Sequence, residues 1–195
     1  SPNWLEFDPK YPHLVYVAAD RGAGDENEGN GNMRILDLKN QYVGTALTEG
    51  DMGGTNRGRA LAFFDENHMA VAVDQGDELR AAVYGFTRNR EAPEGDERNY
   101  KMWGNRLALV NFKACNTVTF HPVDGDMYFN SWDKGQFFKV EKQQIQEIFD
   151  GTRTTPADKE VLFQMDNGWE YNIRIHPTGN YAYIVSINKH YIQRT

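Results

Sequence analysis

Several aromatic, acidic and basic residues are spaced so that they could line one binding surface. Trp132 is followed by Asp133, and Tyr171 comes two residues after Trp169. The flat rings of Trp and Tyr can stack on sugar rings, while Asp, Asn and Arg side chains hydrogen-bond the hydroxyl groups. The predicted ligand-binding set consists of Trp132, Trp169, Tyr171, Asp74, Asp133, Arg57 and Asn116. The alternative is that the two tryptophans pack against neighbouring sheets as structural residues.

A second group of candidates is the acid-rich segment between residues 20 and 32. Calcium binds oxygen ligands, so the candidate metal ligands are Asp20, Asp25, Glu26 and Glu28. Their spacing does not match an EF-hand loop, which has acids at alternate positions and a late Glu. A solvated loop without metal is the alternative, and we expect no cofactor other than this candidate calcium ion.

Motifs for covalent catalysis or nucleotide binding are not evident in the sequence. There is no Gly-x-Ser-x-Gly motif, and Cys115 lies beside strand-like residues, which predicts a buried thiol rather than a nucleophile. The Gly-rich segment 53–58 lacks the Gly-Lys-Ser/Thr ending of a phosphate-binding loop. His121 and His176 each precede a proline in equivalent turns, which indicates turn geometry rather than metal binding. Paired acids for glycoside cleavage stay open, because acids on separate loops can converge.

The elements that position these candidates follow an internal repeat. Four segments share an apolar strand end, a tight turn rich in Pro, Gly or Asn, and a second apolar strand. The residues that anchor them are Phe7, Phe63, Phe120 and Ile175, separated by 56, 57 and 55 residues. A period of this length holds four short strands with their loops, which is the content of one propeller blade.

We therefore predict an all-β fold in which residues 1–195 form a single domain of a partial β-propeller. It would contain about three and a half four-stranded blades of an expected total of about six. Further strands are expected in the second and third repeats, at 81–86, 106–110, 137–140 and 160–163. A short amphipathic helix is expected at 142–150. Since propellers close into rings, we expect either a longer parent chain or self-association through the open blade edges.

The repeat also sorts the connections between strands onto two faces of the domain. The connections that lead into each anchor strand, and those that follow the second strand of each repeat, should lie on one face. We call this the loop face. It would gather the predicted ligand-binding set, although the members are far apart in the sequence.

The overall charge argues against one class of partner. The formal net charge is −7, and the basic residues are scattered singly. An acidic surface repels phosphate backbones, so we expect no nucleic-acid partner. We also expect no transmembrane segment, because no apolar run approaches the length of about 20 residues that a spanning helix needs.

Two copies of the repeat carry a family resemblance. Residues 120–129 (Phe-His-Pro-Val-Asp-Gly-Asp-Met-Tyr-Phe) and residues 175–185 (Ile-His-Pro-Thr-Gly-Asn-Tyr-Ala-Tyr-Ile-Val) resemble the NHL-repeat type of six-bladed β-propeller. Residues 179–192 are similar to propellers of Bacteroidetes cell-envelope proteins that follow an IPT/TIG immunoglobulin-like module. The resemblance implies an extracytoplasmic protein, at the cell surface or in the periplasm and attached to the outer membrane. Such proteins are often associated with glycan capture.

These observations favour a non-enzymatic binding module of a cell-envelope protein. The module would recognise a polysaccharide or a protein partner through the loop face. Two alternatives stay open: a polysaccharide lyase or hydrolase with a loop-face site, and a protein–protein scaffold.

Overall fold

The computed structural model describes ten stretches of the 195-residue chain, namely 2–19, 32–48, 50–53, 58–73, 81–94, 99–112, 115–131, 135–165, 171–186 and 192–194. These residues form four antiparallel sheets and one short helix. Each sheet is built from strands that follow one another along the chain. We call the sheets blades 1 to 4 in chain order.

The strands of the four blades have the following bounds. Blade 1 contains β1 (Pro2–Phe7), β2 (Leu14–Ala19), β3 (Met33–Asp37) and β4 (Tyr42–Leu47). Blade 2 contains β5 (Gly58–Phe63), β6 (His68–Val73), β7 (Ala81–Arg88) and β8 (Trp103–Asn111). Blade 3 contains β9 (Cys115–Phe120), β10 (Met127–Ser131), β11 (Gln136–Val140) and β12 (Glu160–Gln164). Blade 4 contains β13 (Tyr171–Ile175), β14 (Ala182–Ser186) and β15 (Ile192–Arg194).

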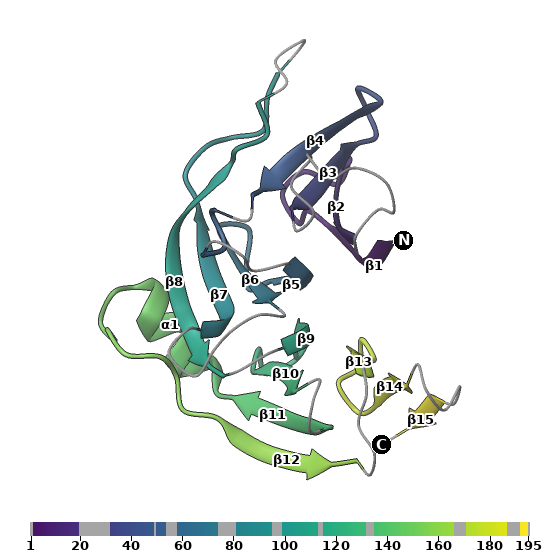
Figure 1. Cartoon of the computed structure of the whole chain (residues 1–195), viewed down its shortest axis with the longest axis vertical. Coiled ribbons are helices and arrows are strands. Elements are labelled where there is room, and N and C mark those ends of the chain that lie inside the picture. The colour runs from purple at the N-terminus through teal and green to yellow at the C-terminus, as the bar shows by residue number, and fades with distance from the viewer. Residues whose placement is uncertain are drawn as a thin grey trace.

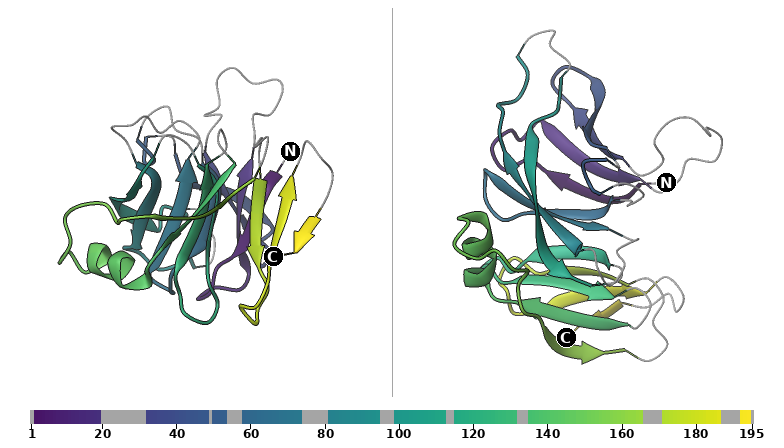
Figure 2. Two further views of the ribbon diagram at one scale, coloured as in Figure 1. Left: turned by 90° about the horizontal axis from the view of Figure 1, so that it is seen from below. Right: turned by 60° about the vertical axis from the view of Figure 1, so that its left-hand side comes forward.

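The blades stand side by side along an arc, with the first strand of each blade on the inside (Figure 1). β5 contacts both β1 and β9, and β9 contacts β13. Seen from the side, the strands stand upright next to one another (Figure 2). Four-stranded antiparallel sheets arranged in this radial way are the building units of a β-propeller. The prediction of a partial propeller is therefore confirmed, with three four-stranded sheets and one three-stranded sheet in the described residues.

The repeat anchors have the same structural position in every blade. Phe7, Phe63, Phe120 and Ile175 are the last residues of β1, β5, β9 and β13. After each anchor the chain reverses in a short turn and enters the second strand. We call the end of the blades that carries these turns, at residues 8–13, 64–67, 121–126 and 176–181, the turn face.

The loop face lies at the opposite end of the strands. There, Gly58 pairs with Val73, Cys115 with Ser131, and Tyr171 with Ser186. Each pair joins the start of an inner strand to the end of the second strand of the same blade. The described strand ends that lie next to the predicted ligand-binding residues in the sequence are therefore all at this one end of the blades.

The main hydrophobic core fills the space between blades 1, 2 and 3. Its fully buried side chains include Tyr16, Leu61, Met69 and Phe129. A separate and much smaller core lies between blades 3 and 4, where Phe137 packs against Ile173 and Ile184. Strand side chains alternate between the two faces of each sheet, so each blade contributes one side to each neighbouring junction.

The predicted helix is confirmed as α1 (Lys142–Phe149), between β11 and β12. Asp126, in the β9–β10 turn, accepts the backbone N–H of Lys142 at 2.8 Å and so caps the start of the helix from a distant segment. The helix ends before Gly151, which has φ of 75°. Phe149 lies against Gly85 of β7, where a Cβ atom would meet its ring at 2.8 Å. A residue larger than glycine would force these two elements apart.

Candidate functional site

Most of the predicted ligand-binding residues lie outside the described residues. These are Trp132, Trp169, Asp74, Asp133 and Arg57. The candidate calcium ligands Asp20, Asp25, Glu26 and Glu28 also lie outside them. Tyr171 begins β13, with its backbone paired to Ser186 at the loop face. Asn116, the second residue of β9, is half-buried at the same end of blade 3.

A buried asparagine shapes the loop-face end of blade 3. The side-chain oxygen of Asn130 accepts the backbone N–H groups of Asn116 at 3.3 Å and Thr117 at 3.0 Å. The pairing of β10 with β9 shifts register between Phe129 and Ser131, so Asn130 replaces ladder hydrogen bonds lost at this bulge. Sequence reasoning missed this role. The signal was a polar residue at the end of an apolar strand, directly before the segment with Trp132 and Asp133.

The single cysteine, Cys115, lies beside this bulge, and its thiol is buried and protonated. Cys115 is fully buried, and its thiol donates a hydrogen bond to the carbonyl oxygen of Thr117 at 3.0 Å. Burial raises the pKa of the thiol to about 12, so it stays protonated at neutral pH. The prediction that Cys115 is buried is confirmed.

The inside of the arc carries a contact between the first and fourth blades. Arg174 of β13 pairs with Glu6 of β1 at 2.8 Å and donates a second hydrogen bond to the carbonyl oxygen of Leu5 at 3.0 Å. Its guanidinium lies 3.7 Å from the centre of the Trp4 ring, which is close enough for a cation–π contact. The Trp4 indole N–H in turn donates to the carbonyl oxygen of Leu61 in blade 2. This group joins the inner strands of three blades.

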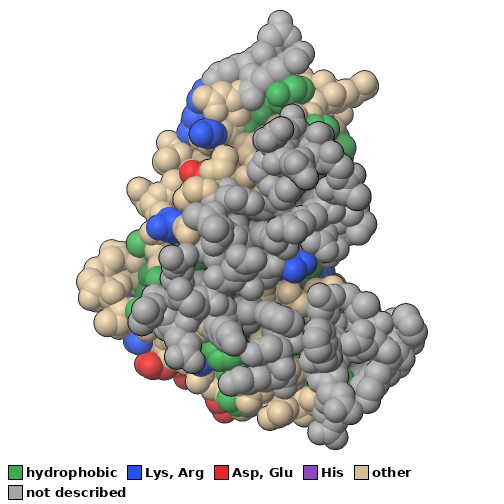
Figure 3. All heavy atoms as spheres, in the orientation of Figure 1, with side chains coloured by type: hydrophobic (Ala, Val, Ile, Leu, Met, Phe, Trp, Pro, Cys, Tyr) green, Lys and Arg blue, Asp and Glu red, His purple; other side chains and the backbone are tan. Residues whose placement is uncertain are grey.

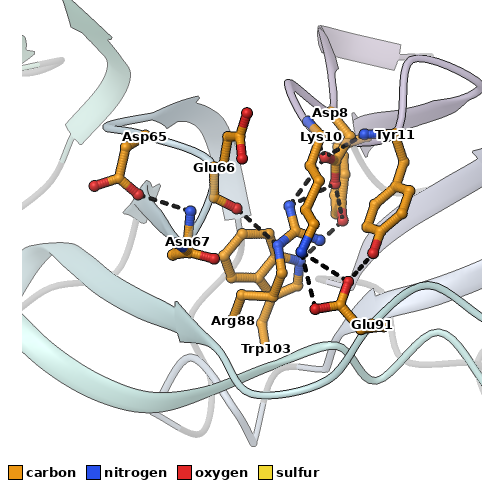
Figure 4. Close-up of polar contacts among 10 residues, drawn as sticks. Asp8, Lys10, Tyr11, Asp65, Glu66, Asn67, Arg88, Glu91 and Trp103 are labelled. Atoms are coloured by element: carbon orange, nitrogen blue, oxygen red, sulfur yellow. Dashed lines mark hydrogen bonds and ion pairs between the residues drawn. The ribbon is translucent and has the colours of Figure 1, made fainter.

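On the turn face, a buried ion pair joins blades 1 and 2 (Figure 4). The guanidinium of Arg88 donates to both carboxylate oxygens of Asp8, at 2.9 and 3.0 Å, and both side chains are almost fully buried. Asp8 also accepts the backbone N–H groups of Lys10 and Tyr11, which fixes the β1–β2 turn. One carboxylate therefore holds its own turn and the neighbouring blade together.

Aromatic rings surround this ion pair. The Arg88 guanidinium lies 4.4 Å from the Trp103 ring centre and 5.3 Å from that of Tyr11. Tyr16 donates to Asp8 at 3.1 Å and accepts the Trp103 indole N–H at 2.9 Å. Burial, together with the negative charge of Asp8, raises the pKa of Tyr16 far above its ordinary value. Tyr16 therefore stays protonated at neutral pH and donates its hydrogen bond to Asp8.

The second turn of blade 1 repeats this arrangement. Asp37 accepts the backbone N–H groups of Lys39 and Asn40, and the Tyr100 hydroxyl donates to it at 2.7 Å. Burial alone would raise the pKa of Asp37, but the hydrogen bonds from Asn40, Tyr100 and Lys39 outweigh burial and lower it. Burial and the hydrogen bond to Asp37 raise the pKa of Tyr100 to about 12. Tyr100 also stacks on Tyr42, with ring centres 5.5 Å apart.

The two equivalent histidines have structural contacts in the turns. The Nε2 atom of His121 lies 3.0 Å from the carbonyl oxygen of Gly179, which joins the turns of blades 3 and 4. His176 bonds within its own turn, where its Nδ1 atom lies 2.8 Å from the Thr178 hydroxyl. Among the described residues, no three His, Cys, Asp or Glu side chains come together as a metal site.

The charged residues in view on the surface are dispersed. In Figure 3, Lys and Arg side chains of the described residues lie at separate places rather than in one patch. The absence of a nucleic-acid partner stays a prediction. Within the described stretches, no helix is long and apolar enough to span a membrane.

The chain is similar to several solved structures, among them three proteins from Bacteroides. No protein-family model matches the chain, and no curated protein matches it. It is similar to an auxiliary nutrient binding protein from Bacteroides thetaiotaomicron, with 30% identity and a TM-score of 0.71, covering 100% of this chain and 38% of that chain. It is also similar to a putative phosphatase from the same organism, with 31% identity and a TM-score of 0.78, covering 97% and 41% respectively.

A third similar structure is an auxiliary nutrient binding protein from Bacteroides ovatus, with 26% identity, a TM-score of 0.68, and coverage of 98% and 38%. The chain thus spans about two fifths of the length of these three structures. A gluconolactonase from Xanthomonas campestris, at 12% identity and a TM-score of 0.61, shares the fold alone. The comparisons support a propeller related in structure to Bacteroides proteins, while membership of the NHL-repeat family stays a prediction.

Proposed function

We propose that this chain is part of a non-enzymatic, nutrient-binding propeller that recognises a polysaccharide or a protein partner through its loop face. The ligand contacts would come from Trp132, Trp169, Tyr171, Asp74, Asp133, Arg57 and Asn116. A polysaccharide is the first choice, because Trp and Tyr rings next to acidic and amide side chains suit a hydroxylated ring.

The observation that supports this proposal is that the strand ends nearest to the proposed contacts all lie at the same end of their blades. The pairs Gly58–Val73, Cys115–Ser131 and Tyr171–Ser186 lie at the same end of blades 2, 3 and 4. In the sequence, each of the seven proposed contacts lies within two residues of one of these paired strand ends. A rigid sheet scaffold that presents loops from neighbouring blades is a common design for a binding face.

Two similar proteins support a binding role, because both are described as auxiliary nutrient binding proteins. A role in capturing nutrients would place the protein outside the cytoplasm, at the cell surface or in the periplasm. This location also follows from the resemblance to propellers of Bacteroidetes cell-envelope proteins.

The test is a titration of the protein with soluble starch, xylan, β-glucan and mannan, followed by tryptophan fluorescence and calorimetry. Saturable binding that weakens at least about tenfold in Trp132→Ala or Trp169→Ala would support the proposal. Tyr181→Ala, an aromatic substitution on the turn face, is the matched control and should bind like the unchanged protein. Variants that unfold, rather than losing the ligand, would assign the two tryptophans to blade packing.

The same titrations separate the alternatives. New reducing ends or unsaturated sugars would show a hydrolase or a lyase, and would replace the binding module with an enzyme. The absence of any glycan response, together with a stable protein partner, would favour a scaffold.

A further inference from the structure

The turn face contains a cavity that the loop-face proposal does not use. It has a volume of about 560 Å³ and lies between the two turns of blade 1 and the β7–β8 connection of blade 2. This volume falls within the range of small-molecule sites. The lining side chains are those of Tyr11, His13, Lys39, Asn40, Glu91, Ala92, Pro93 and Glu94.

Buried contacts hold the walls of this cavity in place. Asp8 fixes the turn that carries Tyr11 and reaches across to Arg88, directly before the β7–β8 connection. Asp37 fixes the turn that carries Lys39 and accepts a hydrogen bond from Tyr100, near the end of the same connection. Each wall from blade 1 is therefore tied to the wall from blade 2 by an aspartate that solvent hardly reaches. Such a cavity is formed before any ligand arrives.

Some polar side chains of the cavity form hydrogen bonds or ion pairs with other described residues, and others do not. Glu91 is engaged, since it forms an ion pair with Lys10 at 2.8 Å and accepts the Tyr11 hydroxyl. The side chains of His13, Lys39 and Glu94 make no hydrogen bond or ion pair with the rest of the described chain. Lys39 and Glu94 line the same cavity but form no ion pair with each other. As far as the described residues are concerned, His13 and Lys39 therefore offer donors, and Glu94 an acceptor, that a ligand in this cavity can engage.

We propose that this cavity binds a neutral oligosaccharide of about two or three sugar units, at a second site that is independent of the loop face. The lining holds two acids, Glu91 and Glu94, and one lysine, Lys39. Lys10, which is not part of the lining, forms an ion pair with Glu91, so the remaining charges of Lys39 and Glu94 offset each other and do not favour a strongly charged ligand. Hydroxyl groups both donate and accept, and therefore satisfy Glu94 on one wall and Lys39 on the other. The rings of Tyr11 and His13 meet edge to face with their centres 6.2 Å apart, so they present two separate ring surfaces against which a sugar ring can pack.

Calorimetric titration of the whole chain with maltotriose, xylotriose, cellotriose and mannotriose tests this proposal. We expect at least one trisaccharide to bind, and Lys39→Met and Glu94→Gln each to weaken it about tenfold. Glu141→Gln, an exposed substitution in blade 3, is the matched control and should leave binding unchanged. Binding should also persist in the Trp132→Ala/Trp169→Ala double variant, which separates this site from the loop face.

Three outcomes would overturn the proposal. The first is that no trisaccharide binds at millimolar concentration. The second is binding that is insensitive to Lys39→Met and Glu94→Gln, or that disappears only in the tryptophan double variant. The third is a response to free lysine or glutamate without a response to neutral sugars, which would assign the cavity to a charged ligand.

Discussion

The junction between blades 1 and 2 differs from the junction between blades 3 and 4. The first is held by a buried ion pair, Asp8–Arg88, with rings of Trp103 and Tyr16 around it. The second is held by the small apolar core of Phe137, Ile173 and Ile184, with one histidine contact at its edge. The same repeat thus builds one junction that depends on matched charges and another that depends on a few apolar side chains.

The polar contacts of the first junction come from the end of β7 and from the β7–β8 connection. Arg88, Glu91 and Tyr100 lie over the turns of blade 1, where each finds an oppositely charged or hydrogen-bonding partner. A buried charge is costly when it loses its partner, whereas a small apolar core loses only packing. The two junctions should therefore respond very differently to single substitutions.

The largest effect is expected from Asp8→Ala. This substitution leaves the Arg88 guanidinium buried without its carboxylate and also removes the acceptor that fixes the first turn. We expect a loss of about 3–5 kcal/mol in the free energy of unfolding, measured by urea denaturation. Asp158→Ala removes an exposed Asp–Arg pair and is the control, with an expected loss of less than about 1 kcal/mol. Equal losses of unfolding free energy in the two variants would show that the buried Asp8–Arg88 pair contributes no more to stability than an exposed pair.

The apolar junction is tested by Ile184→Ala. Ile184 is fully buried against Phe137 and Ile173, so its truncation opens a cavity, with an expected loss of about 2–4 kcal/mol. Val185→Ala changes the next residue, which points to the open side of blade 4 and is 43% exposed. Its expected loss is below about 1 kcal/mol by the same denaturation assay. A similar loss in both variants would contradict the assignment of Ile184 to a junction core.

A smaller effect, with a characteristic pH dependence, is expected from Tyr100→Phe. The variant loses a hydrogen bond to the Asp37 carboxylate, at an expected cost of about 1.5–3 kcal/mol near pH 7. The pKa of Asp37 is lowered in the folded protein, so its contribution to stability is complete above the unfolded pKa of about 3.9. That contribution is lost as the pH falls through the lower, folded pKa.

Tyr100→Phe should therefore raise the folded pKa of Asp37 and flatten the acid limb of the stability profile. Urea denaturation between pH 7 and pH 3 measures this, with Tyr183→Phe, a half-exposed tyrosine of blade 4, as the control. An unchanged pH profile in Tyr100→Phe would show that the hydroxyl does not stabilise the ionised form of Asp37.

The smallest effect is expected at the contact between blades 1 and 4. Arg174 and Glu6 are 48% and 29% exposed, so solvent screens their attraction. We expect Arg174→Ala to cost about 1 kcal/mol or less, including the contact with the Trp4 ring. Arg174→Lys keeps the charge but not the planar stacking, and comparison of the two variants by denaturation separates these parts. A loss above about 3 kcal/mol would mean that this contact, rather than the junction cores, holds the arc together.

The fold could be predicted because it is encoded by local pattern. The anchors at Phe7, Phe63, Phe120 and Ile175 gave the period, and each proved to end an inner strand. Strand lengths were less accurate, since β7 continues to Arg88 and β8 already begins at Trp103. These extra residues are polar or follow an irregular segment, so an apolar pattern does not reveal them.

The polar contacts at the junctions could not be predicted from the sequence, because the residues that form them are far apart along the chain. Asp8 and Arg88 are separated by 80 residues, and Tyr100 and Asp37 by 63. Nothing in the local sequence of a turn shows which distant side chain will reach it. Asp8 and Asp37 are recognisable as turn residues from sequence, but their second partners depend on how neighbouring blades pack.

For the predicted ligand-binding site, the structure describes the position of two residues but does not test their role in binding. Asn116 and Tyr171 were expected in the connections that lead into the anchor strands, but they lie within β9 and β13, at the ends where these strands begin. The ligand role of these residues, and of Trp132 and Trp169, stays a prediction. The turn-face cavity was missed, since it is formed by three connections whose residues meet only in the folded molecule.

The most direct test of the account is hydrogen exchange of the whole chain, with and without a saturating polysaccharide. We expect slower exchange in peptides spanning 115–117, 130–136 and 166–172, next to the loop-face strand ends of blades 3 and 4. Peptides spanning the turns at 121–126 and 176–181 should exchange at the same rate in both samples. Protection confined to the turn-face peptides, with none at the loop-face ends, would contradict the claim that the loop face binds the ligand.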